Sequence, residues 1–228
     1  MKKSTGFKIL REEVISCRLC PRLVLFRENV PPRAAFKDQA YWRKPVPGFG
    51  DPKAWLLITG LAPAADGGNR TGRIFTGDAT ARFLLKALYC QGFANQPTSE
   101  SIDDGLILKG CYMTAAVKCV PPNNKPIRQE ILNCSRYYHR ELHLLSHVKC
   151  ILALGRLAFE AYIHYLKSQE AETRHLKFSH GAYFEIDGFP SLYASYHPSP
   201  QNTYTGKMTE KMFLDLLGTI KEKYHDKD

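Results

Sequence analysis

Residues 54–90 read AWLLITGLAPAADGGNRTGRIFTGDATARFLLKALYC, and this stretch decides the fold. Its first six residues, 54–59, form an apolar run that ends at Gly60, which is typical of a short strand buried on both faces. A glycine-rich loop follows. Asp78 then stands where an N-cap is expected, directly before a helix over 79–90. The stretch therefore predicts a strand, a long loop and a helix.

The same alternation of apolar runs and helical periodicity continues along the chain. Short apolar runs predict further strands, and the segments between most of them carry the periodicity of amphipathic helices. Expected strands cover 111–117, 148–154, 182–186 and 191–196, and expected helices cover 127–147, 155–166 and 208–223. Strands that alternate with helices predict an α/β fold, a three-layer α/β/α sandwich around a mainly parallel sheet.

The expected sheet also predicts where a site lies. Ligands of such sheets bind beyond the carboxyl ends of the strands, and the loops after the first strand and after Tyr196 both fall there. Upstream, residues 8–28 have a helical periodicity that Pro21 interrupts, and 29–53 is expected to be an ordered loop. No repeat, low-complexity segment or linker divides the sequence, so we expect a single domain over residues 1–228.

The composition is that of a basic globular protein. Lys and Arg number 32 against 22 Asp and Glu, which gives a formal charge of +10. This balance favours an acidic partner, of which a nucleic-acid backbone is the commonest, although a basic surface that only aids solubility is the alternative. The sequence has no run of about 18 or more uncharged apolar residues and no apolar signal segment at its N-terminus. We therefore expect a cytoplasmic protein without a membrane span.

Four of the seven cysteines have spacings that indicate metal binding. Cys17 and Cys20 form a C-x-x-C pair, and 14 residues separate Cys119 from Cys134. The second pair is too wide for a zinc-ribbon knuckle, whereas four thiolates can hold a cubane iron–sulfur cluster. On spacing alone, a zinc site and a set of buried thiols remain open as alternatives. The other three cysteines lie in apolar stretches and are expected in the core: Cys90, Cys111 and Cys150.

Two long motifs, together with the four cysteines, resemble one enzyme family. Residues 54–79 resemble motif one, and residues 196–206, YHPSPQNTYTG, resemble motif two, of the family 5 (type B) uracil-DNA glycosylases. Residues 45–52, PVPGFGDP, are similar to that family's pattern as well. The resemblance covers nearly the whole chain. It implies a four-stranded parallel sheet between helices, a [4Fe–4S] cluster held by the four cysteines, and hydrolysis of the bond between a deaminated base and its deoxyribose in DNA.

With this resemblance, three residues become candidates for catalysis. His197, which follows the last strand and is stiffened by Pro198, is expected to donate a ring N–H to O2 of the leaving base. Asp78 is the first candidate carboxylate for positioning water, although its position alone predicts a helix N-cap. Asp66, where the family usually has His, is the second candidate.

The base-binding pocket is expected at Gly60, Ala62, Phe75 and Asn124. Phe75 can stack on a flipped base, with core packing as the alternative. Asn124 can read the edge of the base, although an Asn flanked by this turn sequence is as well suited to forming the turn. Gly60 lets the backbone approach the base closely. A mostly apolar pocket discriminates weakly between bases, so we expect activity on other deaminated bases, such as hypoxanthine, beside uracil.

DNA contacts are expected from both motifs. The residues expected at the DNA backbone, or in the gap that the extruded base leaves, are Ser199, Gln201 and Asn202. Those expected on a positive surface for phosphates are Arg70, Arg73 and Lys207. The expected partner is DNA with deaminated bases, bound by a monomer. Apolar residues where related glycosylases carry polar ones, Ala62 and Ala115 among them, leave open a catalytically inactive iron–sulfur module that binds nucleic acid.

Overall fold

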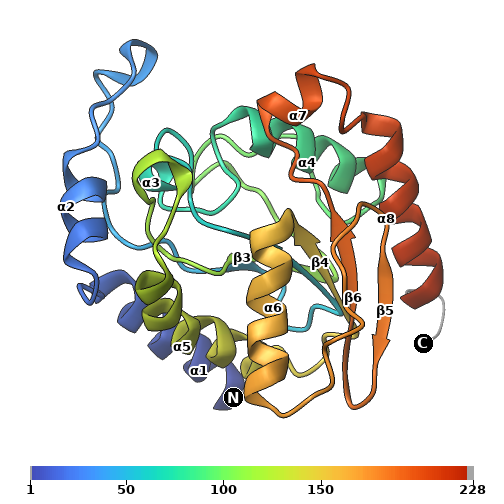
Figure 1. The fold of residues 1–228 in the computed structure, drawn as a ribbon. Helices are drawn as coiled ribbons and strands as arrows, with labels where there is room; N and C mark the ends of the chain where they lie inside the picture. Colours follow the sequence, from blue (N-terminus) through green and yellow to red (C-terminus); the bar gives the residue numbers. More distant parts are fainter. Residues whose placement is uncertain (1, 225–228) are drawn as a thin grey trace.

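The computed structural model describes residues 2–224 and has a six-stranded sheet at its centre (Figure 1). The strands are β1 (Phe49–Gly50), β2 (Leu56–Gly60), β3 (Cys111–Ala115), β4 (Cys150–Leu154), β5 (Tyr183–Ile186) and β6 (Phe189–Ser195). They lie in the order β1-β3-β2-β4-β6-β5. The four inner strands pair in parallel, and β1 and β5 are antiparallel to their neighbours.

The inner strands end together at one edge of the sheet. Gly60 at the end of β2 pairs with Ala115 at the end of β3. Leu154 at the end of β4 pairs in the same way with Ser195 at the end of β6. Because parallel strands in register place their following loops side by side, the loops after β2 and β6 share this carboxyl edge.

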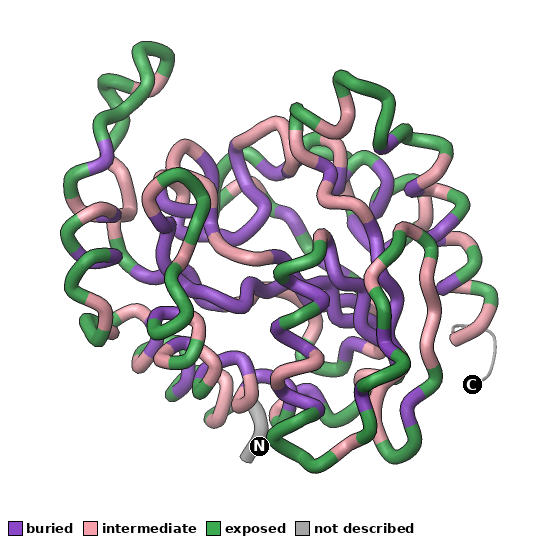
Figure 2. Tube along the Cα trace, in the orientation of Figure 1, coloured by how far each residue is buried: buried purple, intermediate pink, exposed green. Residues whose placement is uncertain are grey.

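Helices cover both faces of the sheet, as Figure 1 shows. One face carries α4 (Ala79–Cys90) and α8 (Glu210–Tyr224), and the other carries α1 (Lys2–Ser16), α5 (Arg128–Leu144) and α6 (Arg156–Ser168). Side chains of β2 alternate between the two layers, as strand geometry requires. Leu56 and Ile58 join the α4–α8 side of the core, and Leu57 joins the α5–α6 side. Figure 2 shows the inner strands buried between these layers.

The N-terminal segment is helical in two pieces. α1 ends at Ser16, and α2 (Pro21–Asn29) begins with Pro21 at its first position, where the missing N–H leaves no hydrogen bond unmade. Residues 31–40 then form an arm that stands off the body and is exposed along most of its length (Figure 2). The arm contains the 3-10 turn η1 (Ala34–Phe36).

The structure confirms the α/β class and the mainly parallel sheet, and it corrects the strand count from four to six. β1 lies inside 29–53, expected as loop, because a two-residue strand has no periodicity to detect. The strand expected at 182–186 is present as β5. It is antiparallel at the sheet edge because a tight turn at Gly188, with φ of 73°, joins it directly to β6.

The burial of the remaining cysteines tests the expectation that all three lie in the core. Cys111 and Cys150 are buried in the core, but Cys90 is exposed, because it lies at the end of α4, beyond the apolar face of that helix. Among residues 2–224, no helix has the length and apolar character needed to cross a membrane.

Candidate active site

Two loops at the carboxyl edge of the sheet carry the expected catalytic residues. The 61–78 loop follows β2 and contains the short helix α3 (Gly68–Thr71). The 196–207 loop follows β6 and contains α7 (Pro200–Tyr204). Figure 1 shows α3 and α7 at the same end of the molecule. Residues that are more than 100 positions apart in the sequence therefore share one edge of the sheet.

His197 lies just beyond the end of β6 and is half-buried. Its backbone carbonyl accepts hydrogen bonds from Asn202 Nδ2 at 2.7 Å and from Ser199 N at 2.8 Å. The side chain lies against Gly155, where an added Cβ would be 3.3 Å from the His197 Cβ. Burial lowers the pKa of His197 to about 4, because a poorly solvated site disfavours the charged imidazolium. The ring is therefore neutral at pH 7 and has one N–H to donate.

Asp78 caps the N-terminus of α4. Its Oδ1 accepts a hydrogen bond from Ala81 N at 2.8 Å, and its backbone is extended, as an N-cap requires. Its Oδ2 lies over Gly67, where any added Cβ would clash with this oxygen. Burial raises the pKa of Asp78, and the hydrogen bond from Ala81 partly opposes this rise. One carboxylate oxygen therefore holds the helix, and the other faces the 61–78 loop.

Phe75 packs over the carboxyl end of β2. Its φ of 49° lies in the left-handed region, which is rare for a bulky residue and marks local strain. The ring covers Gly60, where an added Cβ would be only 2.8 Å from the Phe75 Cζ. A residue without a side chain is therefore required at position 60. Phe75 belongs to the core on the α4–α8 side, so its ring links the core to the carboxyl edge.

Asp66 is engaged by the arm. Its carboxylate is ion-paired with Arg33 Nε at 2.6 Å and accepts a hydrogen bond from the Tyr41 hydroxyl at 2.9 Å. Its backbone carbonyl accepts a bond from Arg70 Nε at 2.7 Å. The carboxylate of Asp66 therefore connects the arm to the 61–78 loop, whereas Asp78 Oδ2 has no such cationic partner among the described residues.

Arg70 braces the same loop. Its Nη2 donates to the Gly77 carbonyl at 2.9 Å, and its Nη1 donates to Gln39 Oε1 in the arm at 2.7 Å. The guanidinium carbon also lies 4.0 Å from the centre of the Phe36 ring, a cation–π contact. Part of its charge is thus committed to holding the arm and the loop together.

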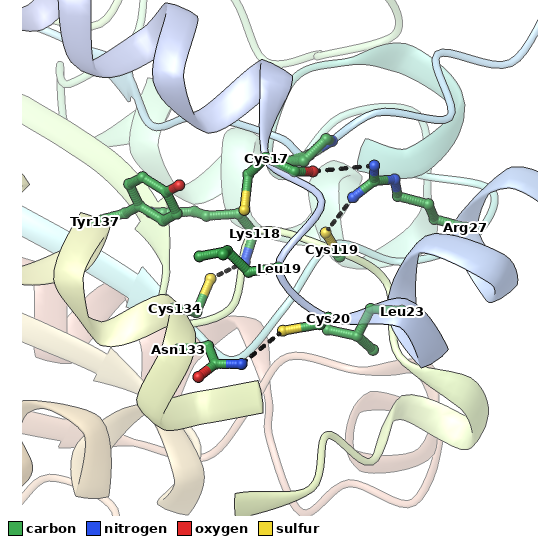
Figure 3. A pocket seen from close by; sticks show the side chains of 11 residues that line it. Cys17, Leu19, Cys20, Leu23, Arg27, Lys118, Cys119, Asn133, Cys134 and Tyr137 are labelled. Atoms are coloured by element: carbon green, nitrogen blue, oxygen red, sulfur yellow. Dashed lines mark hydrogen bonds between the residues drawn. The ribbon is translucent and has the colours of Figure 1, made fainter. Parts of the chain in front are cut away.

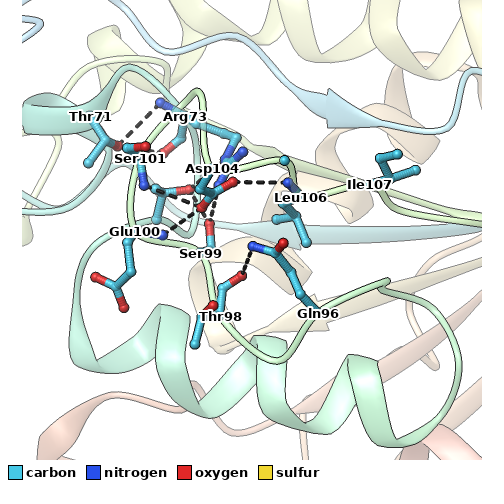
Figure 4. Close-up of polar contacts among 12 residues, drawn as sticks. Thr71, Arg73, Gln96, Thr98, Ser99, Glu100, Ser101, Asp104, Leu106 and Ile107 are labelled. Atoms are coloured by element: carbon cyan, nitrogen blue, oxygen red, sulfur yellow. Dashed lines mark hydrogen bonds and ion pairs between the residues drawn. The ribbon is translucent and has the colours of Figure 1, made fainter.

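Arg73 is buried, which corrects the expectation that it extends an exposed positive surface. Figure 4 shows its guanidinium facing Asp104, and its Nη2 lies 2.6 Å from Asp104 Oδ2. The same side chain donates to Ser99 Oγ at 2.7 Å and to Thr76 Oγ1 at 2.9 Å. Because a buried cation needs a paired anion, Arg73 serves to fasten the 61–78 loop to residues 99–104.

Ala62 and Asn124 are the other two expected base-binding residues. Ala62 packs against the residue cluster that contains Val117 and Cys119. Asn124 is exposed and has φ of 57°, in the 3-10 turn η2 (Pro122–Asn124). This left-handed conformation is the one that Asn tolerates in turns, and the sequence already pointed to that role as the alternative.

The 196–207 loop presents polar groups and one aromatic ring to solvent. Gln201 and Lys207 are exposed, Ser199 is half-buried, and Asn202 uses its amide to hold the His197 carbonyl. Tyr204, at the end of α7, is 84% exposed. Its exposure could not be found from the sequence, because an aromatic residue at the end of a short helix is more often packed than solvated.

The four spaced cysteines surround one small cavity, which Figure 3 shows. They reach it from different parts of the chain: the α1–α2 connection supplies two, the segment after β3 supplies the third, and α5 supplies the fourth. Burial raises the pKa of the Cys119 thiol to about 11 and that of Cys134 to about 12. A zinc site needs side chains that meet at one ion through short bonds. Among the described residues, no group of three or more His, Cys, Asp or Glu side chains has such an arrangement.

Three of the four sulfurs at this cavity accept a hydrogen bond. The most notable is Arg27, a buried guanidinium whose Nη1 donates to a thiol and whose Nε has no partner among the described residues. The pairs are Arg27 Nη1 to Cys119 Sγ (3.0 Å), Lys118 N to Cys134 Sγ (3.1 Å) and Asn133 Nδ2 to Cys20 Sγ (3.4 Å). Donors and a buried cation around four sulfurs suit ligands that carry negative charge.

Comparisons with known proteins identify the family to which this fold belongs. The family model of the uracil DNA glycosylase superfamily matches residues 47–221. A type-5 uracil-DNA glycosylase from Thermus thermophilus is 49% identical over 208 residues, which cover 90% of this chain and 93% of the relative. The type-5 uracil-DNA glycosylase from Pyrobaculum aerophilum is 44% identical over 204 residues, with 90% and 87% covered.

The chain is thus an α/β protein of the uracil DNA glycosylase superfamily, built around a mainly parallel sheet. A type-5 relative from Mycobacterium leprae is 43% identical over 93% of both chains. A type-4 uracil-DNA glycosylase from Sulfurisphaera tokodaii is more distant, at 34% identity over 64% of this chain. Within the superfamily, the chain belongs to the type-5 uracil-DNA glycosylases.

Proposed function

We propose that this protein is a uracil-DNA glycosylase that hydrolyses the bond between uracil and its deoxyribose in DNA and leaves an abasic site. The observation that carries the proposal is His197, a histidine kept neutral by burial at the carboxyl edge of the sheet. The membership of the type-5 family supports the same activity. The reaction is the first step of base excision repair.

The reaction needs a site that holds an extruded base and takes up the charge it develops. The bond between N1 of uracil and C1′ of the sugar breaks, and its electron pair leaves with the base. We infer that the neutral ring of His197 donates its N–H to O2 of the departing base. One such donor is worth about 2.7–4 kcal/mol in the transition state, or roughly 10²–10³ in rate. The ring of Phe75, at the end of β2, is the candidate surface for stacking on the base.

The water that attacks C1′ needs a group to orient it and accept its proton. Asp78 is our candidate, because its Oδ2 is free of ion pairs among the described residues and faces the 61–78 loop. Its raised pKa makes it a better proton acceptor than an ordinary aspartate. Asp66 is the weaker candidate, since its carboxylate is bound by Arg33 and Tyr41.

The DNA contacts that we propose come mainly from the 196–207 loop. Gln201 and Lys207 are exposed there, and Ser199 and Asn202 lie beside His197. Arg70 contributes from the 61–78 loop as far as its contacts with the arm leave its charge available. The substrate is chromosomal DNA, so we propose a cytoplasmic enzyme of a prokaryote-type cell, acting as a monomer in which residues 1–228 form one domain.

The cofactor that we propose is a [4Fe–4S] cluster held by Cys17, Cys20, Cys119 and Cys134. Four thiols around one cavity, three of them with a hydrogen-bond donor and with Arg27 buried among them, suit the charge of such a cluster. Bound there, the cluster would supply cross-links among the N-terminal helices, the segment after β3 and α5. Arg27 and the neighbouring donors would hold the ligands in place.

We also propose that the enzyme acts on other deaminated bases, such as hypoxanthine. Three of the four residues expected in the pocket, Gly60, Ala62 and Phe75, offer no polar side-chain atom to reject a wrong base, and the fourth, Asn124, lies exposed in a turn. Discrimination by shape and stacking alone is weak, because no buried polar group is left unpaired when another base enters.

The test is cleavage of a labelled duplex that contains one uracil, followed by alkali to break the abasic site. The proposal expects strand breaks at the uracil position with the parent protein and a loss of at least about 100-fold with His197→Ala. A parent protein that binds the duplex and never cleaves it would instead establish the inactive binding module. A panel of duplexes with hypoxanthine or xanthine tests the breadth, and strict uracil specificity would refute it.

A further inference from the structure

A row of four side chains, with a cation at each end and two aromatic rings between them, runs beside His197. The Lys207 Nζ lies 4.7 Å from the centre of the Tyr196 ring. The ring centres of Tyr196 and Phe178 are 6.3 Å apart. The guanidinium carbon of Arg156 lies 5.3 Å from the centre of the Phe178 ring. We call these four residues the cation–aromatic strip. They come from three parts of the chain: the 196–207 loop supplies two of them, the segment before β5 supplies one, and the start of α6 supplies one.

Two members of the strip, Tyr196 and Arg156, adjoin the candidate active site. Tyr196 directly precedes His197. Arg156 follows Gly155, against which the His197 side chain packs, with 3.3 Å between the two Cβ positions. The strip therefore begins at the carboxyl edge of the sheet, on the α6 side of the catalytic histidine.

The Tyr196 ring is held in place from behind. His180 stacks on it with 5.1 Å between ring centres and 21° between ring planes. The Tyr196 backbone N also donates to His180 Nδ1 at 3.3 Å. A ring fixed in this way loses little freedom when something binds against it, and such preorganisation favours affinity.

Beyond Phe178 the strip continues into a groove between α6 and residues 171–178. The groove has a volume of about 820 Å³, and Arg156 and Phe178 form part of its lining. Its other charged lining residues are Glu160, Lys167, Glu172, Arg174 and Lys177. Cations therefore outnumber anions by four to two along it. Neither Arg156 nor Lys207 has an ion-pair partner among the described residues, and both are exposed.

We propose that the cation–aromatic strip and this groove bind the DNA strand that flanks the extruded nucleotide. The inference rests on the proposed glycosylase function and adds a second contact surface to it. Extrusion breaks the base stack and leaves the neighbouring nucleotide with an open face. Phosphates of that strand meet the free charges of Arg156 and Lys207, and an unstacked base meets the rings between them. Interleaved cations and aromatic rings are the usual means of holding single-stranded nucleic acid.

The test measures binding of a fluorescent duplex that carries one tetrahydrofuran abasic site, by anisotropy at several salt concentrations. The double variant Arg156→Ala/Lys207→Ala removes the two free charges of the strip. The matched control is Lys53→Ala/Lys109→Ala, which removes two exposed lysines just before β2 and β3, at the opposite edge of the sheet. Phe178→Leu keeps an apolar side chain against Phe159 and removes the stacking ring.

The strip variant is expected to bind at least tenfold more weakly at low salt, with a salt slope smaller by about 1.4–1.8, because each of the two phosphate contacts contributes about 0.7–0.9. Phe178→Leu is expected to weaken binding about fivefold or more with an unchanged slope, since stacking carries no counterions. The control variant should match the parent in both measurements. Equal affinities and slopes for the strip variant and the control would overturn the proposal.

The strip and the glycosylase proposal can fail separately. If the parent cleaves a uracil duplex but the strip variant binds as the control does, the strip is wrong and the enzyme activity stands. If the parent binds the abasic duplex through the strip and never cleaves uracil, the strip stands and the catalytic proposal fails.

Discussion

Because His197 stays neutral, we expect the cleavage rate to depend on pH differently from that of an enzyme with an ordinary histidine donor. With a pKa of about 4, about 3% of the rings are protonated at pH 5.5, whereas at the ordinary value of about 6.5 about 90% would be. If the neutral ring is the donor to the leaving base, the cleavage step should therefore keep nearly its full rate through the range where an exposed histidine titrates.

The assay is single-turnover cleavage of a uracil duplex between pH 5 and 8, with enzyme in excess. Asp78 also titrates at the acid end, because its pKa is raised and only the carboxylate accepts a proton. The profile is therefore measured in the parent and in Asp78→Asn, which keeps a cap for α4 but has no carboxylate. We expect Asp78→Asn to be slower by tenfold or more and to have a flat profile from pH 8 to about 5.

A half-maximal rate near pH 6.5 in Asp78→Asn would refute this account of His197.

The lowered pKa of His197 also affects the stability of the folded protein. Because the folded value lies below the unfolded one, the unfolded chain binds more protons between pH 6.5 and 4. The contribution of the neutral His197 ring to the free energy of unfolding is fully present above pH 6.5. It is lost as the pH falls toward 4, and the loss is up to about 3 kcal/mol. Urea unfolding of the parent and of His197→Asn at pH 7 and 4.5 measures this difference.

Three other variants test separate parts of the structure. Gly67→Ala should lower the cleavage rate as much as Asp78→Asn does, because its Cβ displaces Asp78 Oδ2, and a rate within threefold of the parent in single-turnover assays would contradict this. Lys118→Met removes the cation that lies 2.6 Å from the buried carboxylate of Glu141. The free energy of unfolding in urea should fall by about 3–5 kcal/mol, because a buried charge is left without its ion-pair partner. A fall below about 1 kcal/mol would be inconsistent with a buried pair. Cys119→Ser should abolish the absorbance near roughly 400 nm that an iron–sulfur protein shows, and a colourless parent that holds stoichiometric zinc would refute the cluster itself.

Gly218→Ala in α8 is the control for the glycine variant. An added Cβ at this position has its nearest neighbour, Gln91 Nε2, at 3.7 Å, an ordinary contact. The substitution should leave the cleavage rate unchanged and add up to about 1 kcal/mol of stability, because alanine favours helix over glycine.

The sequence predicted the inner sheet well because each of its strands is buried on both faces. A run such as 54–59 is apolar throughout, and few other local structures require that. β1 has only two residues and pairs with β3 through contacts that no local pattern reveals. The N-cap of α4 was predictable for a related reason, since the geometry of a cap depends on its immediate neighbours.

Parts of the site that depend on distant partners could not be predicted. Arg73 was expected on the surface, because no local sequence pattern indicates that Asp104 is its ion-pair partner in the fold. Asp66 was a candidate catalytic carboxylate in the sequence, which did not reveal that Arg33 and Tyr41 contact it in the fold. The cation–aromatic strip joins three segments that are adjacent only in the folded chain, so its residues gave no shared signal in the sequence.

The central claim is that the neutral ring of His197 takes up charge from the departing base. The most direct measurement is a crystal structure of the protein with an abasic duplex and free uracil. The account predicts a ring nitrogen of His197 at about 2.7–3.2 Å from O2 of the uracil, with the geometry of a hydrogen bond. A uracil bound beyond the carboxyl edge with the His197 ring turned away from it, and with O2 bonded to some other group, would contradict the account.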